Sequence, residues 1–188
     1  MISIGLDLSI NSTGICVYND KTDEHNYYII THKLTKKQKE FKHKHLKYVL
    51  YEKEQPNKAD EYREKERKKS SNISSIVEQI EKIVQKFDKK GDLVCVIEGI
   101  SYGSSSSSAL ADLAGLNHAV RYMLWSNNVP FKIVAPTENK KFAVGNGQAD
   151  KDVMVAAWKK CQPEMAKIED LKIDDVADAY FLSQFLEK

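Results

Sequence analysis

The stretch GLDLSINSTG, residues 5–14, places Asp7 at the end of a short apolar segment, where a buried strand would end. Small and polar turn residues follow the aspartate, and a second apolar segment begins at Gly14. A buried, ionised carboxylate is costly unless it is paired, hydrogen-bonded or bound to a metal. Asp7 therefore has three candidate roles: a metal ligand, part of a phosphate-binding turn, or an ordinary residue that begins a hairpin.

The apolar segments predict an α/β fold. Short polar turns separate three strand-like segments, ISIGLDL, GICVYN and NYYIITHKL, which predict an antiparallel meander over 2–8, 14–19 and 26–34. Two later segments, 92–100 and 131–135, predict strands that helical crossovers would make parallel. Helical spacing of apolar residues predicts helices over 71–87, 109–125, after Asp150 and over 174–186.

Length and composition limit the class of protein. A chain of 188 residues suffices for one well-buried core and is short for two full domains, so we expect a single domain over residues 1–188. No apolar run reaches the roughly 18–20 residues that span a bilayer. The N-terminus lacks the pattern of a signal peptide, and the three cysteines are widely spaced. These features predict a cytoplasmic protein with no membrane partner.

Positive charge is concentrated in one segment. Residues 33–69 contain 14 Lys or Arg and 7 Asp or Glu, whereas the whole chain has a net charge of only +2. The segment is poor in apolar residues, so we expect a basic insertion at about 34–70 that is loop-like or partly helical. A basic segment beside an acidic body is typical of a protein that binds a polyanion, although lysine-rich runs are more often solvated surface.

Four acids occupy positions that suggest a shared site. Asp7 and Glu98 each end an apolar strand, and the ends of neighbouring parallel strands lie close together. Asp175 and Asp178 are three residues apart, so they share one face of the last helix. Acids in the first turn of a helix also complement the helix dipole, which is the simpler explanation of this pair. If all four converge, their oxygens suit Mg²⁺ or Mn²⁺, and two ions about 4 Å apart would serve in-line attack on a phosphodiester.

The motifs and their order resemble the RuvC family of Holliday junction resolvases, within the ribonuclease H-like superfamily. The resemblance spans most of the chain outside 34–70 and rests on four stretches, GLDLSINSTG, VIEGISYG, NKKFAVGNGQADK and DVADAYF. It implies a five-stranded mixed sheet, made of the antiparallel meander plus two parallel strands, flanked by helices. The implied activity is metal-dependent resolution of four-way DNA junctions by paired, symmetric nicks, carried out by a homodimer.

The resemblance implies a set of metal ligands by position. Asp7, Glu98, Asp175 and Asp178 would be catalytic and would hold two Mg²⁺ ions, with Mn²⁺ as a substitute. Asp174 competes with its neighbour for one of these positions. The DxxD spacing favours Asp175.

Four further residues are assigned by the same resemblance. Lys151 corresponds to a catalytic lysine near the scissile phosphate, where a fixed cation would offset charge that develops in the transition state. Lys140 corresponds to a DNA-binding position, and Lys141 is the competing choice. Tyr102 is the candidate wedge that stacks on an unpaired base, although it falls one residue later than the family's usual spacing.

The resemblance also implies a dimer interface and leaves one segment unexplained. In the helix SALADLAGLNHAVRYMLW, Ala111 and Gly115 would allow close approach of a second copy, and the same residues would equally pack the helix onto its own sheet. The insertion at 34–70 is longer than we expect in the family. It could extend the DNA surface, alter the dimer or broaden the substrates to other branched DNA. A compact chain with such an insertion suits a phage or viral resolvase, which would act in the host cytoplasm.

Other functions use similar motifs. A ribonuclease H that cleaves RNA–DNA hybrids shares the metal chemistry and is the main alternative. A sugar-kinase or actin-like ATPase also has an aspartate-bearing first hairpin, but it needs two lobes, and this chain has no internal repeat. A DNA-binding module without catalysis would be expected to lose some of the four acids, because they repel one another unless a metal neutralises them.

Overall fold

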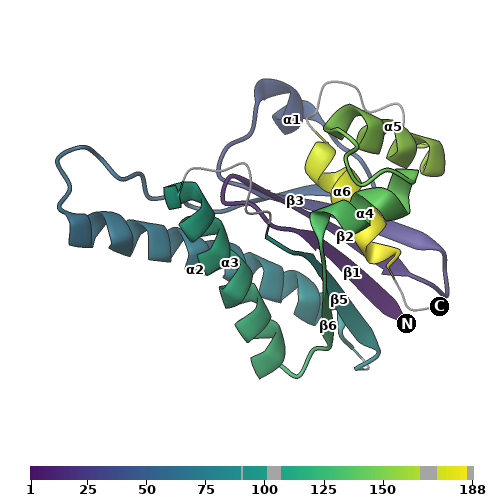
Figure 1. Cartoon of the computed structure of the whole chain (residues 1–188), viewed down its shortest axis with the longest axis horizontal. Coiled ribbons are helices and arrows are strands. Elements are labelled where there is room, and N and C mark those ends of the chain that lie inside the picture. Colours follow the sequence, from purple (N-terminus) through teal and green to yellow (C-terminus); the bar gives the residue numbers. More distant parts are fainter. Residues whose placement is uncertain (90, 101–106, 166–172, 186–188) are drawn as a thin grey trace.

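The computed structural model describes residues 1–89, 91–100, 107–165 and 173–185. Within these ranges six strands form one mixed sheet in the order β4-β3-β2-β1-β5-β6, with helices on both faces (Figure 1). The strands are β1 Ile2–Asp7, β2 Ser12–Asn19, β3 Glu24–Thr31, β4 Leu46–Leu50, β5 Leu93–Glu98 and β6 Phe131–Val134. The helices are α1 Lys36–Glu40, α2 Tyr62–Phe87, α3 Ser107–Ser126, α4 Pro136–Val144, α5 Lys151–Cys161 and α6 Asp174–Ser183.

The predicted strands pair as expected. β1, β2 and β3 form the antiparallel meander, and β5 and β6 extend it as parallel strands on the other side of β1. Leu6 of β1 pairs with Ile97 of β5, so the residues that follow, Asp7 and Glu98, end neighbouring strands. We call this side of the sheet its carboxyl end. The α/β fold with a mixed sheet is therefore confirmed.

The prediction of five strands is wrong by one. β4 comes from the basic insertion and lies parallel to β3, from the pair Tyr27 and Leu46 to the pair Thr31 and Leu50. The crossover between these strands carries α1, which begins with a capping box between Thr35 and Gln38. β4 is short and at the edge of the sheet, and its last residue is 56% exposed, so the apolar signal of a buried strand is weak.

Helix α2 begins at Tyr62, nine residues before the predicted start at residue 71. Its first turns extend past the sheet, at the left of Figure 1, and bury few apolar side chains. Ion pairs along the helix surface stabilise them instead, among them Arg67 with Glu64 at 2.9 Å and Lys69 with Glu66 at 3.0 Å. Helical spacing of apolar residues does not detect such a segment.

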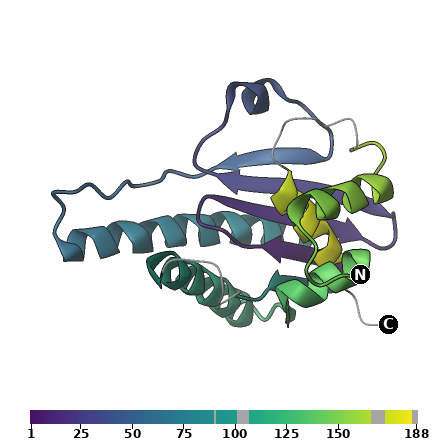
Figure 2. The same cartoon turned by 45° about the horizontal axis from the view of Figure 1, so that its top comes forward.

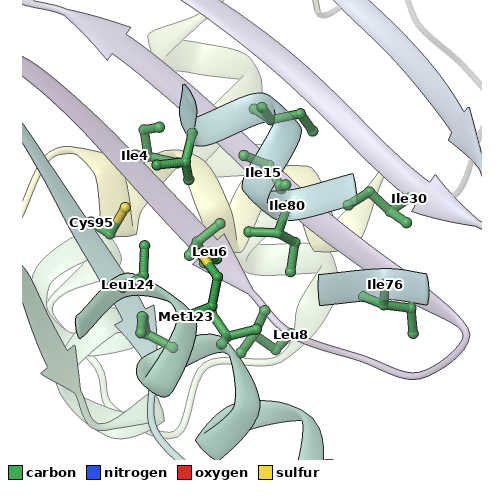
Figure 3. Packing of buried hydrophobic residues seen from close by; sticks show 14 of the residues in the cluster. Ile4, Leu6, Leu8, Ile15, Ile30, Ile76, Ile80, Cys95, Met123 and Leu124 are labelled. Atoms are coloured by element: carbon green, nitrogen blue, oxygen red, sulfur yellow. The ribbon is translucent and has the colours of Figure 1, made fainter. Parts of the chain in front are cut away.

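The two faces of the sheet have separate hydrophobic cores. On one face, Ile4 and Leu6 of β1 pack with Ile76 and Ile80 of α2 and with residues of α3 (Figure 3). On the other, Tyr27 of β3 packs with residues of α5 and α6, and helices α4, α5 and α6 lie together (Figure 2). None of the helices in the described ranges is long and apolar enough to cross a bilayer.

Helix α6 lies directly on β1 and β2 because both strands have glycine beneath it. A Cβ atom at Gly5 would overlap the carbonyl oxygen of Ala179 and lie 2.6 Å from the nitrogen of Ser183. A Cβ atom at Gly14 would overlap the carbonyl oxygen of Asp175 and lie 2.9 Å from the Cβ of that residue. Gly14 is the strand partner of Asp7, so this contact brings the start of α6 to the carboxyl end of the sheet.

The end of the insertion is tied to the turn that follows β1. We call residues 51–56 the strap. The hydroxyl of Tyr51 donates a 2.5 Å hydrogen bond to the carbonyl of Ile10, and Lys53 Nζ donates a 2.6 Å bond to Asn11 Oδ1. Buried Asn72 of α2 accepts from the Glu54 amide at 2.8 Å and donates to the Glu54 carbonyl at 2.9 Å. The strap therefore connects the β1–β2 turn to α2.

We expect Gly14→Ala to destabilise the protein by roughly 1–3 kcal/mol, because the added methyl group must displace helix α6. The measurement is the free energy of unfolding in urea. Ser74→Ala is the control, since this side chain is exposed on α2 and lies in none of the contacts described above. This change should be neutral or stabilising by about 0.5 kcal/mol, because alanine favours the helix more than serine does. Equal effects of the two substitutions would contradict the close contact of α6 with the sheet.

Candidate active site

The four predicted acidic residues lie at the carboxyl end of the sheet, on the face that α6 covers. Asp7 ends β1, Glu98 ends β5, and α6 presents Asp175 and Asp178 from its first two turns. The charges of Glu98, Asp175 and Asp178 all act on Asp7, which places the four groups within electrostatic reach of one another. Three segments that are far apart in the sequence therefore meet at one site.

Three polar side chains that the sequence analysis missed hold this arrangement. Ser12, the first residue of β2, donates a hydrogen bond from its Oγ to Asp175 Oδ2. Asn117 of α3 donates to the carbonyl of Glu98 at 3.0 Å. An asparagine at a position of a helix where the apolar pattern predicts burial could have been recognised in the sequence. It indicates a nearby hydrogen-bond acceptor, because buried amides require partners.

Asn139 of α4 is the third such residue and is fully buried. Its Nδ2 donates to the carbonyl of Asp178 at 3.3 Å, and its side chain also hydrogen-bonds Glu98. One amide therefore joins α4, α6 and the end of β5. It precedes Lys140 in the motif that carries the family resemblance.

Burial and mutual repulsion make the four acids reluctant to ionise. Burial, followed by the charges of Glu98, Asp175 and Asp178, raises the pKa of Asp7 well above its usual value. Burial and the charge of Asp178 raise the pKa of Glu98 to about 7. Burial raises the pKa of Asp175 and of Asp178 to about 6, although the Ser12 hydroxyl opposes the shift at Asp175.

Lysines from two helices partly offset this repulsion. Lys151 begins α5, and its Nζ lies 2.5 Å from Asp174 Oδ2, an ion pair that raises the pKa of Lys151. Its charge lowers the pKa of Asp178, as does that of Lys140. Lys141, the competing choice, is exposed on α4. Tyr102 lies outside the described residues.

The four carboxylates suit a divalent cation by their chemistry. They supply only oxygen donors, which Mg²⁺ and Mn²⁺ prefer. Asp178 Oδ1 is buried and has no hydrogen-bond partner among the described residues, so one oxygen is available as a ligand. In the described ranges no three Asp, Glu, His or Cys side chains already form a closed metal cluster. Binding of a cation would therefore draw the carboxylates together against their repulsion.

We expect the metal-free protein to lose stability as the pH rises from about 4 to about 7. The folded pKa values near 6 and 7 lie above the unfolded values of about 4, so the folded state holds more protons in this window. With a chelator present, the free energy of unfolding should be lower at pH 7.5 than at pH 5.5 by at least about 1 kcal/mol. Asp7→Asn should reduce this difference, and Mg²⁺ at pH 7.5 should reverse it. A pH-independent free energy of unfolding would contradict the repulsion.

Comparison with known proteins identifies the family. The family model described as "Crossover junction endodeoxyribonuclease RuvC" matches residues 57–183. A search of curated protein sequences gave no match. The family match begins at residue 57 and therefore does not include β1–β4. These strands are compared with known proteins through solved structures.

Solved structures share the fold over nearly the whole chain. RuvC of Thermus thermophilus aligns with a TM-score of 0.56 at 12% identity, over 97% of this chain and 91% of its own. The same protein in complex with a Holliday junction substrate gives 0.60 at 11% identity, over 97% and 90%. The yeast mitochondrial Holliday junction resolvase gives 0.54 at 14% identity, over 96% and 75%. The chain belongs to the RuvC family of crossover junction endodeoxyribonucleases.

Proposed function

We propose that this junction-resolving endonuclease cuts four-way DNA by paired, symmetric nicks, at a site made of Asp7, Glu98, Asp175 and Asp178. The convergence of these four carboxylates from β1, β5 and α6 is the observation that carries the proposal. Repulsion within an acidic cluster lowers the stability of the folded protein. A divalent cation would relieve this repulsion, so the cation would bind favourably. This argues for catalysis rather than for a DNA-binding module that has lost it.

The proposed cofactor is Mg²⁺, with two ions and with Mn²⁺ as a substitute. Bound at the four carboxylates, the ions would activate water and stabilise the attacking and leaving oxygens of a phosphodiester. Ser12 and Asn139 would orient the carboxylates, since each hydrogen-bonds one of them. The choice of Asp175 over Asp174 is favoured by contacts: Asp174 already pairs with Lys151, whereas Asp175 lies above Gly14 beside Asp7.

The proposed role of Lys151 is to stabilise charge on the scissile phosphate. Its side chain is 71% exposed, so it can reach a substrate, and the Asp174 carboxylate holds it beside the acids. Lys140 is the better of the two proposed phosphate contacts because its charge acts on Glu98 and Asp178. Lys141 remains a candidate for DNA farther from the cut. The wedge role of Tyr102 stays a prediction.

The proposed substrate is branched DNA. A relative with the same fold has been solved in complex with a Holliday junction, which supports the four-way junction as the substrate here. The insertion adds positive charge beside the sheet, in α1 and β4, and this supports attraction of the DNA backbone. Cleavage of RNA–DNA hybrids uses the same metal chemistry and is the alternative that an experiment must exclude.

The proposed homodimer would use the outer face of α3. Ala111 and Gly115 are exposed there, followed along the helix by Tyr122 at 67% and Trp125 at 70% exposure. The two aromatic rings lie 6.2 Å apart and form one apolar patch. Small residues that permit close approach, next to exposed aromatic side chains, are typical of an interface core.

We expect the protein to nick a labelled four-way junction symmetrically with Mg²⁺ or Mn²⁺ and to be inactive with a chelator. Asp7→Asn should lower the rate more than about 100-fold, because it removes a ligand charge. Asp152→Asn, an exposed acid in the first turn of α5, is the matched control and should keep wild-type activity. Linear duplex and an RNA–DNA hybrid are assayed in parallel. Cleavage of the hybrid in preference to the junction would replace this function by that of a ribonuclease H.

We expect Trp125→Glu to convert the dimer into monomers, because it places a charge within the exposed aromatic patch of the proposed interface. Sedimentation equilibrium measures the mass, and the junction assay should then give single nicks instead of paired ones. Tyr62→Glu is the control, since this aromatic side chain is 79% exposed on a different helix. A wild-type monomer, or a Trp125→Glu dimer, would contradict the assignment of α3 as the interface.

A further inference from the structure

A cavity of about 440 Å³ lies at the carboxyl end of the sheet, on the face opposite the four carboxylates. Its wall comes from the β1–β2 turn, the strap, α2 and α3. The strap belongs to the basic insertion, so this cavity depends on the segment for which the family resemblance gives no role. Its size falls within the roughly 300–1,000 Å³ of small-molecule sites.

We propose that this cavity receives one unpaired nucleotide of the branched DNA substrate, an inference that rests on the proposed function. Its lining combines apolar surface with hydrogen-bonding groups, as a nucleobase requires. The apolar residues are Leu8, Ile10, Pro56, Ile73 and Leu113, and the polar and charged ones include Asn11, Lys53, Lys69, Asn72 and Asp112. Enzymes that take a base out of its stack hold it between apolar side chains and read its edge by hydrogen bonds.

The charged groups of the cavity lining are complementary to the phosphate and the base of a nucleotide. Lys53 of the strap lies at the cavity rim, where its Nζ donates a hydrogen bond to Asn11 Oδ1. Lys69 of α2 lies 3.4 Å from Asp112 of α3, so this acid is paired and does not oppose a phosphate as a free charge. A carboxylate can also accept a hydrogen bond from the amino group of a base. The Lys53 ammonium, whose partner Asn11 is uncharged, would attract the phosphate of the same nucleotide. The charge of Lys69, in contrast, is offset by Glu66 and Asp112.

The position of the cavity connects it to the cutting site. Leu8, which lines the cavity, directly follows Asp7, and consecutive Cα atoms lie 3.8 Å apart. Asp7 faces α6 whereas Leu8 faces α2 and α3, because side chains alternate along a strand. A DNA strand crossing the β1–β2 turn would thus present a phosphate to one face and a nearby base to the other. A branch point supplies such a base at little cost, since unpairing is cheapest where pairing is already broken.

The test uses four-way junctions with 2-aminopurine at successive positions around the crossover, a base analogue that brightens when it leaves its stack. The junctions are bound to the Asp7→Asn protein, so that no cleavage interferes. We expect a several-fold rise in fluorescence at one position or two adjacent positions. Ala109→Trp, at the exposed rim of the cavity on α3, should abolish the rise by filling the space. Ala59→Trp, exposed in the insertion and outside the lining, should leave the rise unchanged.

A second pair of variants tests the charge at the rim without altering the core. Lys53→Ala should weaken junction binding about fivefold or more, and Lys58→Ala should change it less than twofold. Both remove one lysine of the insertion, but Lys58 is exposed and outside the lining. Of these two variants, only Lys53→Ala should reduce the fluorescence rise.

The possible outcomes separate this inference from the proposed function. A protein that cleaves junctions but gives no fluorescence rise, or a rise that Ala109→Trp leaves intact, would overturn the nucleotide site while the nuclease remains. Absence of both cleavage and junction binding would overturn the proposed function itself. Saturable binding of a deoxynucleoside monophosphate, with no response from the junction, would assign the cavity to a free nucleotide and contradict the proposal.

Discussion

The close contact between α6 and the glycines of β1 and β2 is the constraint on which the site depends. Without side chains at Gly5 and Gly14, the helix backbone rests on the strands, and its acidic first turns reach the end of β1. A methyl group at either glycine would occupy the space of a helix carbonyl. Two acids on α6 and two on the sheet share one site only at this short separation. The spacing is therefore set by backbone packing and not by the acids themselves.

Burial and mutual repulsion of the four acids disfavour the packing of α6 on the sheet that brings them together. Each is shifted towards its protonated form, mainly by burial, and the shifts at Asp7 and Glu98 also contain repulsion from other members of the site. Hydrogen bonds from Ser12 and Asn139 and the charge of Lys151 offset part of this cost. The cost itself favours cation binding, because a bound cation relieves repulsion that the fold has already created.

The sequence was informative where burial leaves a strong pattern. The apolar strands and the turns between them predicted the meander and the parallel strands. The family was predicted from the resemblance of four motifs and their order, not from the burial pattern. β4 was missed because an edge strand of five residues buries little, and the first turns of α2 were missed because ion pairs stabilise them.

Side-chain contacts were harder to predict than the elements that carry them. The pairing of Asp174 with Lys151 and the bridging role of Asn139 depend on how α4, α5 and α6 meet, and a single sequence contains no direct signal of that meeting. The cavity between the strap and the helices is a product of the same tertiary packing.

The position of β4 has a consequence for how copies of this chain behave in solution. An outermost strand exposes unpaired backbone groups that can recruit a strand from another molecule and start aggregation. Here that strand carries Lys47 on its exposed side and is preceded by Lys42 and Lys44, so two such edges would repel each other. The lysines that would draw DNA towards the protein therefore also keep neighbouring molecules from joining their sheets. One set of charges would serve both substrate attraction and colloidal stability.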